Sequence, residues 1–394
     1  MSEIRESGLV LSAEDRLVLT AARLRPREDE LAELVSLQEL DWDLVITRAQ
    51  THRVLPLLHR SLALVWNGVP QPAAERIRRV YLQVVVANLI QNEELTRITR
   101  AFNEKGIDIL PMKGPSLAER VYGDVTLRMF SDLDILVPAG AVLAAKSLLQ
   151  ELGYVPEPMN LEQEKIHLRA GCEYGFTRRR GDSPVNVDLH WAVMVRRIGT
   201  MLNAADLWKR SVPSEVGGAV ARRMACEDEL LYLCIHGWAH CWESLLWMCD
   251  IHEFLERYRH SIDWSEFLER AKENKLQRIV GTALWLVERL FRSELPPELA
   301  DVTRRDQHWR PLAVRVEDSF PGISRPRTNV EEQLFCLRSL PTLGRQATLL
   351  GQLLFCPTTA DFREFPLPST ATWVYPFVRP IRIAWKILSG RQGL

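Results

Sequence analysis

Two aspartates separated by a single residue, Asp132 and Asp134, carry the clearest chemical signal in this sequence. They open an apolar run that is typical of a strand, and alternate residues of a strand face the same side, so both carboxylates project together. Two like charges held side by side repel unless a cation lies between them, and Mg²⁺ prefers hard oxygen ligands of this kind. Asp188 lies between Val187 and Leu189 in a later predicted strand. It would supply the third carboxylate of a site for two Mg²⁺ ions.

Positive charges and a glycine precede the two aspartates. Lys113-Gly114 follows a strand-like run, and Arg128 lies four residues before Asp132. Gly114 lets the backbone approach a phosphate closely, and Lys113 and Arg128 would supply positive charge, Arg128 through its planar fork. Ser131, next to the first aspartate, completes the predicted nucleotide-binding set. The site could thus take a ligand with phosphate groups beside the metal ions, and the family resemblance described below implies that this ligand is a nucleoside triphosphate (NTP), in the first instance ATP.

Each of these residues also has a purely structural interpretation. A lone Asp-X-Asp is a weak signal, because many surface strands and loops contain one. Asp188 taken alone fits an exposed strand residue, and Arg128 could form a structural ion pair with Asp132 or Asp134. The conjunction of the three acids, the glycine and the two basic residues favours a functional site.

The elements that must position these side chains form a small α/β region. Its apolar periodicity predicts strands at 107–112, 131–137, 173–178 and 185–191, with helices at 116–122 and 139–152 between them.

Helices are predicted on both sides of this region. A long one covers 73–105; later ones cover 227–242, 245–258, 264–274 and 278–291, followed by a loop at 303–328 and an aromatic and basic segment at 376–388. We expect an α+β fold, in which a small domain with a sheet (105–215) is flanked by an N-terminal helical region (1–104) and a C-terminal helical domain (216–394). The family resemblance described below implies that this small domain is catalytic and that its sheet is mixed.

Composition narrows the class of protein. With 394 residues, 46% apolar and 26% charged, the chain can bury a sizeable core. The net charge of −1 makes nucleic acid an unlikely partner. The first 16 residues do not resemble a signal peptide, and no apolar run approaches the ~18 residues of a spanning helix. Seven cysteines without a CxxC pair suggest reduced thiols and a cytoplasmic location.

A family resemblance rests on several of these motifs together. The runs 111–122 and 128–137, which contain Lys113-Gly114 and the two aspartates, resemble a poorly characterised bacterial nucleotidyltransferase family of the DNA polymerase beta-like superfamily. Residues 187–191 resemble the later acidic motif of that family, and 236–242 with 247–250 resemble its helical signature. Better-known members of the superfamily have a Gly-Ser pair where this chain has Lys113-Gly114, which leaves the geometry of phosphate binding open.

The resemblance implies metal-dependent transfer of a nucleoside monophosphate from the NTP to an acceptor hydroxyl. One Mg²⁺ would orient the triphosphate and the other would lower the pKa of the acceptor hydroxyl. Members of the family are often associated with gene clusters for peptide natural products or polysaccharides, so a small peptide or a sugar is the expected kind of acceptor. Two alternatives remain: a phosphotransferase that uses the same metal site, and a non-catalytic nucleotide-binding scaffold.

Two further motifs have competing interpretations. His236 and His240 have the i, i+4 spacing of a zinc helix, but the run His-Gly-Trp-Ala-His lacks the glutamate of a zinc hydrolase, so packing or substrate contact is favoured. Asp250, in the later helix, is expected to orient a helix or a histidine. The aromatic and basic tail fits either a weak membrane-surface helix or a terminal helix that docks on its own protein.

Overall fold

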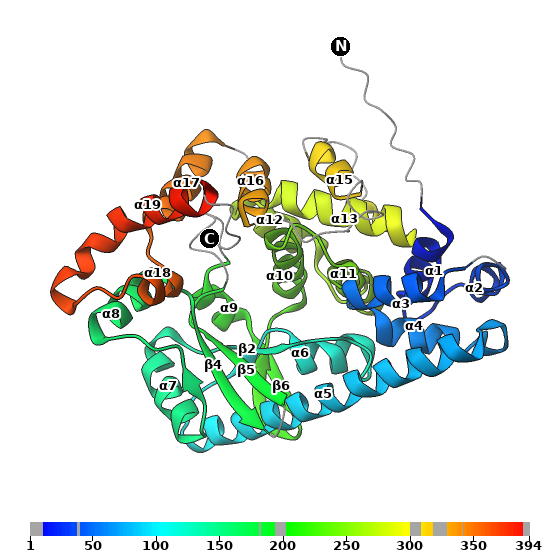
Figure 1. Ribbon diagram of the computed structural model, residues 1–394, viewed down its shortest axis with the longest axis horizontal. Coiled ribbons are helices and arrows are strands. Elements are labelled where there is room, and N and C mark those ends of the chain that lie inside the picture. Colours follow the sequence, from blue (N-terminus) through cyan, green and yellow to red (C-terminus); the bar gives the residue numbers. More distant parts are fainter. Residues whose placement is uncertain are drawn as a thin grey trace, which may run out of the picture.

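A computed structural model describes residues 11–37, 40–180, 183–193, 202–299, 309–317, 329–340 and 342–388. It confirms the α+β fold: a mixed five-stranded sheet lies between N-terminal and C-terminal helices (Figure 1). The helices before the sheet are α1 (Ala13–Ala21), α2 (Glu28–Val35), α3 (Trp42–Thr51), α4 (Leu55–Leu62), the short η1 (Trp66–Gly68) and the long α5 (Gln71–Glu104).

The central sheet has the strand order β1-β2-β5-β4-β3. Its strands are β1 (Leu110–Pro111), β2 (Asp132–Leu136), β3 (Val155–Pro156), β4 (Glu173–Arg180) and β5 (Ser183–His190). The neighbours β2 and β5 are parallel, and the other pairs are antiparallel. Between these two strands the chain runs through η3 (Ala139–Ala141), α7 (Val142–Glu151), β3, α8 (Leu161–Ala170) and β4, a connection long enough for a parallel pair.

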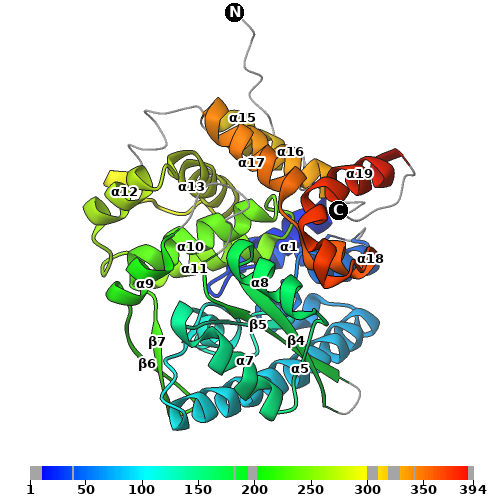
Figure 2. The ribbon, with the colours of Figure 1, turned by 90° about the vertical axis from the view of Figure 1, so that its left-hand side faces the viewer.

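The two faces of the sheet differ in chemistry. Leu133, Ile135, Val187 and Leu189 face one side and belong to a hydrophobic core that also contains buried side chains of α5 and α7. The intervening positions, among them the aspartates of β2 and β5, face the other side. Figure 2 shows α5 and α7 below the sheet and the C-terminal helices above it. The period-2 alternation therefore separates a structural face from a polar one.

The first predicted strand and helix differ from their predicted bounds. Only Leu110–Pro111 of the run 107–112 pairs with β2. The following helix starts at Gly114 as α6 (Gly114–Leu117) and widens into the π-helical η2 (Ala118–Tyr122), which ends at Gly123 with φ of 76°. Glycine favours this left-handed conformation because it has no Cβ.

The C-terminal part begins with α9 (Ala204–Arg210) and the hairpin of β6 (Val212–Val216) and β7 (Ala219–Arg223). Four helices follow close to the predicted positions: α10 (Cys226–Ala239), α11 (Leu245–Tyr258), α12 (Trp264–Glu273) and α13 (Gln277–Phe291). The last elements are α15 (Arg310–Glu317), α16 (Asn329–Ser339), α17 (Leu343–Phe355), α18 (Thr359–Glu364), η5 (Ser369–Val374) and α19 (Tyr375–Leu388).

The prediction of a loop over 303–328 is wrong for α15. This segment forms a helix that buries Ala313 and Val316, although Pro311 and its many charges weaken the apolar pattern. Proline is tolerated there because it lies in the first turn of the helix. The remaining parts of the predicted loop, 303–308 and 318–328, lie outside the described residues.

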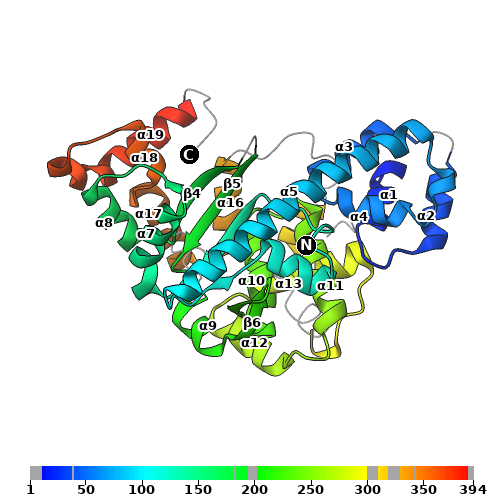
Figure 3. The same cartoon turned by 90° about the horizontal axis from the view of Figure 1, so that it is seen from below.

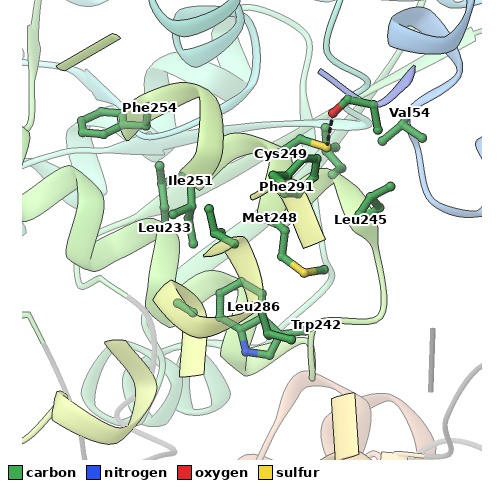
Figure 4. Packing of buried hydrophobic residues seen from close by; sticks show 14 of the residues in the cluster. Val54, Leu233, Trp242, Leu245, Met248, Cys249, Ile251, Phe254, Leu286 and Phe291 are labelled. Atoms are coloured by element: carbon green, nitrogen blue, oxygen red, sulfur yellow. Dashed lines mark hydrogen bonds between the residues drawn. The ribbon is translucent and has the colours of Figure 1, made fainter. Parts of the chain in front are cut away.

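The N-terminal and C-terminal helices share one hydrophobic core. It combines buried side chains of α1–α4 with those of α10, α11 and α13. In Figure 4, Val54 and Leu245 lie close to Cys249 and Phe291, and the Cys249 thiol donates a hydrogen bond to the Ala22 carbonyl at 3.2 Å. The helices that precede the sheet in the sequence and those that follow it therefore pack together around a single core.

The C-terminal segment docks on its own chain. Arg379 and Arg382 of α19 form buried ion pairs with Asp361 of α18, at 2.6 Å each. Tyr375 accepts a hydrogen bond from the Gln163 amide of α8 at 3.0 Å. Among the described helices, none is long and apolar enough to cross a bilayer.

Candidate functional site

The parallel register of β2 and β5 brings the three predicted carboxylates together. Asp134 is directly beside Asp188, and Asp132 is beside Asn186. Side chains at paired positions of neighbouring strands project to the same face, so Asp188 lies on the same side of the sheet as Asp132 and Asp134. All three line one cavity of about 480 Å³.

All three regions of the chain contribute to this cavity. The N-terminal helices supply Arg53, from the turn between α3 and α4, and the C-terminal part supplies residues of α10, α11 and α16. The side chains and backbone that line it are Arg53, Lys113, Gly114, Arg128, Phe130, Asp132, Asp134, His167, Gly171, Cys172, Glu173, Asp188, His190, Tyr232, His236, Ala239, His240, Trp247 and Gln333.

Asp134 is the most strongly bound of the three acids. Its Oδ2 lies 3.0 Å from Lys113 Nζ, and its Oδ1 lies 3.2 Å from His190 Nε2. Burial by itself would raise the pKa of Asp134, but Lys113 and His190 outweigh it and hold the pKa well below its usual range. The carboxylate is therefore ionised and already neutralised by positive charge.

His190 is fixed between two acids. Its Nδ1 lies 3.2 Å from Glu173 Oε2, and its Nε2 faces Asp134. Burial lowers the pKa of the imidazole, but Glu173 and Asp134 more than compensate and raise it well above its usual value. The doubly protonated ring fixes the orientation of the Asp134 carboxylate.

Asp132 and Asp188 have a different environment. Within the described part of the chain, neither carboxylate has a hydrogen-bond or ion-pair partner at short range. Burial and then the charge of Asp134 raise the pKa of Asp132. Burial, Glu173 and Asp134 raise the pKa of Asp188 to about 7. The oxygen atoms of these two carboxylates are available to bind a cation, and the positive charge around them is too small to offset the causes that raise their pKa.

The backbone opposite Asp188 leaves space. Gly175 of β4 pairs with Asp188, and a Cβ at Gly175 would lie 3.7 Å from Asp188 Oδ1. Because glycine has no side chain, Gly175 leaves the approach to the Asp188 carboxylate open. Among the described residues, no group of three or more His, Cys, Asp or Glu side chains is already arranged to hold a metal ion. A bound ion would therefore require the acids to rearrange.

The predicted nucleotide-binding residues lie at or near the cavity. Gly114 has φ of +60°, and a Cβ there would lie 3.4 Å from the Asp132 carbonyl oxygen. Lys113 Nζ lies between Asp134 and His236, 3.4 Å from His236 Nε2. Ser131 is exposed at the rim and its Oγ accepts a hydrogen bond from Arg53 Nη2 at 3.4 Å.

Arg128 lines the cavity, but its guanidinium is bound to a partner. Its Nε and Nη2 donate to the two oxygens of Asp250, each at 2.7 Å, and the Tyr122 hydroxyl donates to the same carboxylate at 2.7 Å. Both ends of the ion pair are buried, with 4% and 1% of the side chains exposed. Arg128 thus forms a structural ion pair, with Asp250 rather than with Asp132 or Asp134.

Arg53 is a site residue that the sequence analysis did not identify. It has φ of 58°, a conformation uncommon for a residue with a side chain. The turn is fixed because the Ser244 hydroxyl and the Leu246 amide donate to the carbonyl of the preceding His52, at 2.8 and 3.2 Å. No motif marks Arg53, because it is 79 residues from Asp132 in sequence. Glu173 and His190 were also missing from the predicted set. The two-residue spacing of Asp188 and His190 on one strand is a signal that could have placed His190 on the same face.

The wall formed by α10 and α11 is aromatic and uncharged. His236 and His240 lie edge to face at 4.8 Å, and His240 stacks on Trp247 at 5.0 Å. Burial and then Lys113 lower the pKa of His240 to about 4 and that of His236 well below its usual value. The rings are therefore neutral at pH 7. Gly237 is required between them because a Cβ there would overlap Trp242 at 2.1 Å.

Comparison with known proteins identifies a family. A family profile described as an uncharacterised nucleotidyltransferase matches residues 38–292, well over half of the chain. The matched range contains α3 to α13, and with them Arg53, the three acids and His240. No curated protein matches the chain. No solved structure matches it either.

Proposed function

The chain belongs to the family of uncharacterised nucleotidyltransferases, and from that premise we propose that it is a magnesium-dependent enzyme that transfers a nucleoside monophosphate from ATP to an acceptor hydroxyl. The observation that carries this proposal is the set of three carboxylates on one face of two parallel strands, at the edge of a cavity. Membership of the DNA polymerase beta-like superfamily is part of the same proposal.

The donor set suits Mg²⁺. Asp132, Asp134 and Asp188 offer hard oxygen ligands, and two of the three accept no hydrogen bond from a described residue. Burial is the first cause of the raised pKa of Asp132 and of Asp188, and repulsion from the charge of Asp134 adds to it in both. We propose that these three residues hold two Mg²⁺ ions. When bound, the ions would neutralise charge on the triphosphate and lower the pKa of the acceptor hydroxyl.

Two cations face the space where a triphosphate would lie. Lys113 now neutralises Asp134, and it would be released to a phosphate when another cation takes its place. Arg53 is half-buried, lines the cavity and donates a hydrogen bond to Ser131, the residue before Asp132. A guanidinium can bind two phosphate oxygens at once. We propose Lys113 and Arg53, with the Gly114 backbone, as the phosphate-binding group, and Arg128 as the brace of the strand that follows it.

The chain's own residues do little covalent chemistry in such a reaction. The acceptor oxygen bonds to the α-phosphorus and its hydroxyl gives up a proton, while the bond from this phosphorus to the bridging oxygen breaks and pyrophosphate leaves. Positioning of the two substrates and neutralisation of their charge supply the rate enhancement. His190 keeps Asp134 oriented, and the neutral wall of His240 and Trp247 offers a stacking surface for a planar ring.

The acceptor is proposed to be a small peptide or a sugar, and the compartment to be the cytoplasm. None of the seven cysteines forms a disulfide in the described structure, as expected in a reducing compartment.

The test uses ATP labelled on either the α- or the γ-phosphate. The full chain is incubated with each ATP, Mg²⁺ and a panel of peptides and sugars, and products are identified by mass spectrometry. An acceptor that gains AMP and the α-label, with release of pyrophosphate, supports the proposal. Gain of the γ-label identifies a phosphotransferase instead, and nucleotide binding without any transfer identifies a scaffold.

A matched variant keeps this experiment interpretable. Asp134→Asn preserves the shape of the side chain and removes its charge. It should bind no nucleotide in a magnesium-dependent way yet melt as a folded protein. Transfer that persists in Asp134→Asn would contradict the three-carboxylate site.

A further inference from the structure

One stripe of α10 forms a wall of the cavity that contains the three carboxylates. Four residues line the cavity at intervals of four, three and one, the last at the C-terminal cap of the helix: Tyr232, His236, Ala239 and His240. Such intervals keep side chains on one side of a helix. Figure 1 shows α10 above the sheet, and in the view from below α5 crosses in front of the sheet, on its other side (Figure 3). The stripe therefore lies across the cavity from the sheet.

Tyr232 differs from every other tyrosine of the chain in the bonding of its hydroxyl. The residue is only 1% exposed, yet its hydroxyl makes no hydrogen bond to a residue that the structure describes. The other six of the seven tyrosines each form a hydroxyl hydrogen bond within the chain: Tyr81, Tyr122, Tyr154, Tyr174, Tyr258 and Tyr375. A buried tyrosine hydroxyl normally has a partner. The partner of the Tyr232 hydroxyl must therefore come from the cavity that the side chain lines.

The Tyr232 hydroxyl can act as a hydrogen-bond donor but not as a base. Burial, and then the charges of Asp134 and Asp132, raise the pKa of Tyr232 well above its usual value. The hydroxyl is therefore protonated at neutral pH and can donate one hydrogen bond. The ring packs nearly parallel to that of His236, with the ring centroids 6.1 Å apart. A protonated phenol without a protein acceptor suits an oxygen atom of a bound ligand.

We propose that the Tyr232 hydroxyl donates a hydrogen bond to the α-phosphate of the bound nucleotide. This inference rests on the proposed function, in which the three carboxylates hold the metal ions beside the phosphate that is transferred. Of the groups of an NTP, the α-phosphate is the one that must lie beside these carboxylates, and Tyr232 lines the same cavity. A hydrogen bond to an anionic oxygen is of the strong, charge-assisted kind. The acceptor hydroxyl is a less suitable partner, because it must lose a proton and a protonated phenol cannot take it.

Tyr232→Phe removes only the hydroxyl, and calorimetric titration in saturating Mg²⁺ compares its affinity for ATP and AMP with that of the wild type. Adenosine is measured as a competitor of ATP. Loss of a hydrogen bond to a charged group should weaken ATP by about tenfold to a hundredfold. AMP should lose the same factor, because it also has the α-phosphate, and adenosine should lose nothing.

Three other patterns overturn the proposal. A loss for ATP alone would place the hydroxyl on the β- or γ-phosphate. A loss that includes adenosine would place it on the nucleoside. Unchanged affinity for ATP and AMP would show that the hydroxyl does not contact the nucleotide.

Tyr154→Phe is the matched control. Tyr154 is also buried, but its hydroxyl donates to Glu94 at 2.7 Å, outside the cavity. This variant should lower the melting temperature and leave the affinity for both nucleotides unchanged. Tyr232→Phe should do the reverse, because it breaks no hydrogen bond within the described chain. A Tyr232→Phe protein that melts well below the wild type without ligand would overturn the inference that this hydroxyl has no partner in the protein.

Failure of this contact is distinguishable from failure of the proposed activity. A wild-type chain that binds ATP and AMP but transfers nothing contradicts the activity, and the affinities of Tyr232→Phe still decide the contact. A chain that transfers AMP, and that binds ATP and AMP as tightly with Phe at position 232 as with Tyr, overturns only the contact. A wild-type chain that binds neither nucleotide overturns both.

Discussion

Two buried ion pairs near the same strand behave as opposites. Arg128 and Asp250 share two hydrogen bonds, with Tyr122 as a further donor, and almost none of either side chain is exposed. Lys113 and Asp134 share one contact at the wall of a cavity, and Asp134 is also bound by His190. The first pair is complete and closed to solvent. The second pair lies where it can exchange partners: a metal ion can replace Lys113 at Asp134, and a phosphate can replace Asp134 at Lys113. An arginine fork suits a permanent brace, and a lysine point charge suits an exchangeable one.

Breaking the closed pair should have the largest effect. Arg128→Ala leaves Asp250 buried and uncompensated, so it should lower the free energy of unfolding by about 3–5 kcal/mol. Urea denaturation followed by circular dichroism measures this loss. ATP and AMP affinities, compared on whatever folded fraction remains, should fall together. A stable Arg128→Ala protein that loses ATP but not AMP would instead make Arg128 a phosphate ligand.

Arg53 extends the comparison to a cation whose guanidinium, in the described part of the chain, donates to the Ser131 hydroxyl rather than to a carboxylate. Arg53→Ala should weaken ATP by about tenfold to a hundredfold, because a charge-assisted hydrogen bond contributes roughly 1.5–3 kcal/mol. AMP should be little affected, since it lacks the β- and γ-phosphates. Arg53→Lys should recover part of the affinity. Calorimetric titration with ATP and AMP measures both affinities. Equal losses of affinity for the two nucleotides would show that Arg53 does not bind the phosphates.

Removing Lys113, the exchangeable partner of Asp134, should strengthen the binding of Mg²⁺ instead of weakening binding. Lys113→Met takes away the cation that now neutralises Asp134, so Mg²⁺ without nucleotide should bind about tenfold more tightly. ATP in saturating Mg²⁺ should bind more weakly. Isothermal titration with Mg²⁺ and then with ATP measures both. If Lys113→Met bound Mg²⁺ less tightly than the wild type, the hypothesis that Lys113 and the metal ion compete for Asp134 would be wrong.

The smallest effect concerns Asp188 and pH. Because its pKa is raised to about 7 in the folded protein, the protonated form is favoured by folding. Its contribution to stability is complete below about pH 4 and is lost as the pH rises through 7. Asp188→Asn should therefore stabilise the metal-free protein on the order of 1 kcal/mol at pH 8 and less at pH 5. Melting curves at both pH values, in the presence of a chelator, measure the difference. A gain that is the same at both would show that ionisation of Asp188 does not matter.

Local pattern was sufficient to predict much of this protein. Alternation along 131–137 placed Asp132 and Asp134 on one face, and the period of the helices gave α10 to α13 to within three residues at either end. Both signals are short-range, because they follow from the repeat of a strand or a helix. The α+β fold followed from the order of these elements.

Tertiary structure decided which charges meet. The sequence could not show that β2 and β5 are parallel neighbours in the register that pairs Asp134 with Asp188. It could not show that Asp250, 122 residues away, is the partner of Arg128. Arg53 reaches the cavity only because its turn is bonded to the start of α11. An isolated arginine has no periodicity to reveal it, and long-range ion pairs depend on how separate elements pack. The sequence by itself determined the chemistry of the acids, and the packing of three separate regions decided which cations face them.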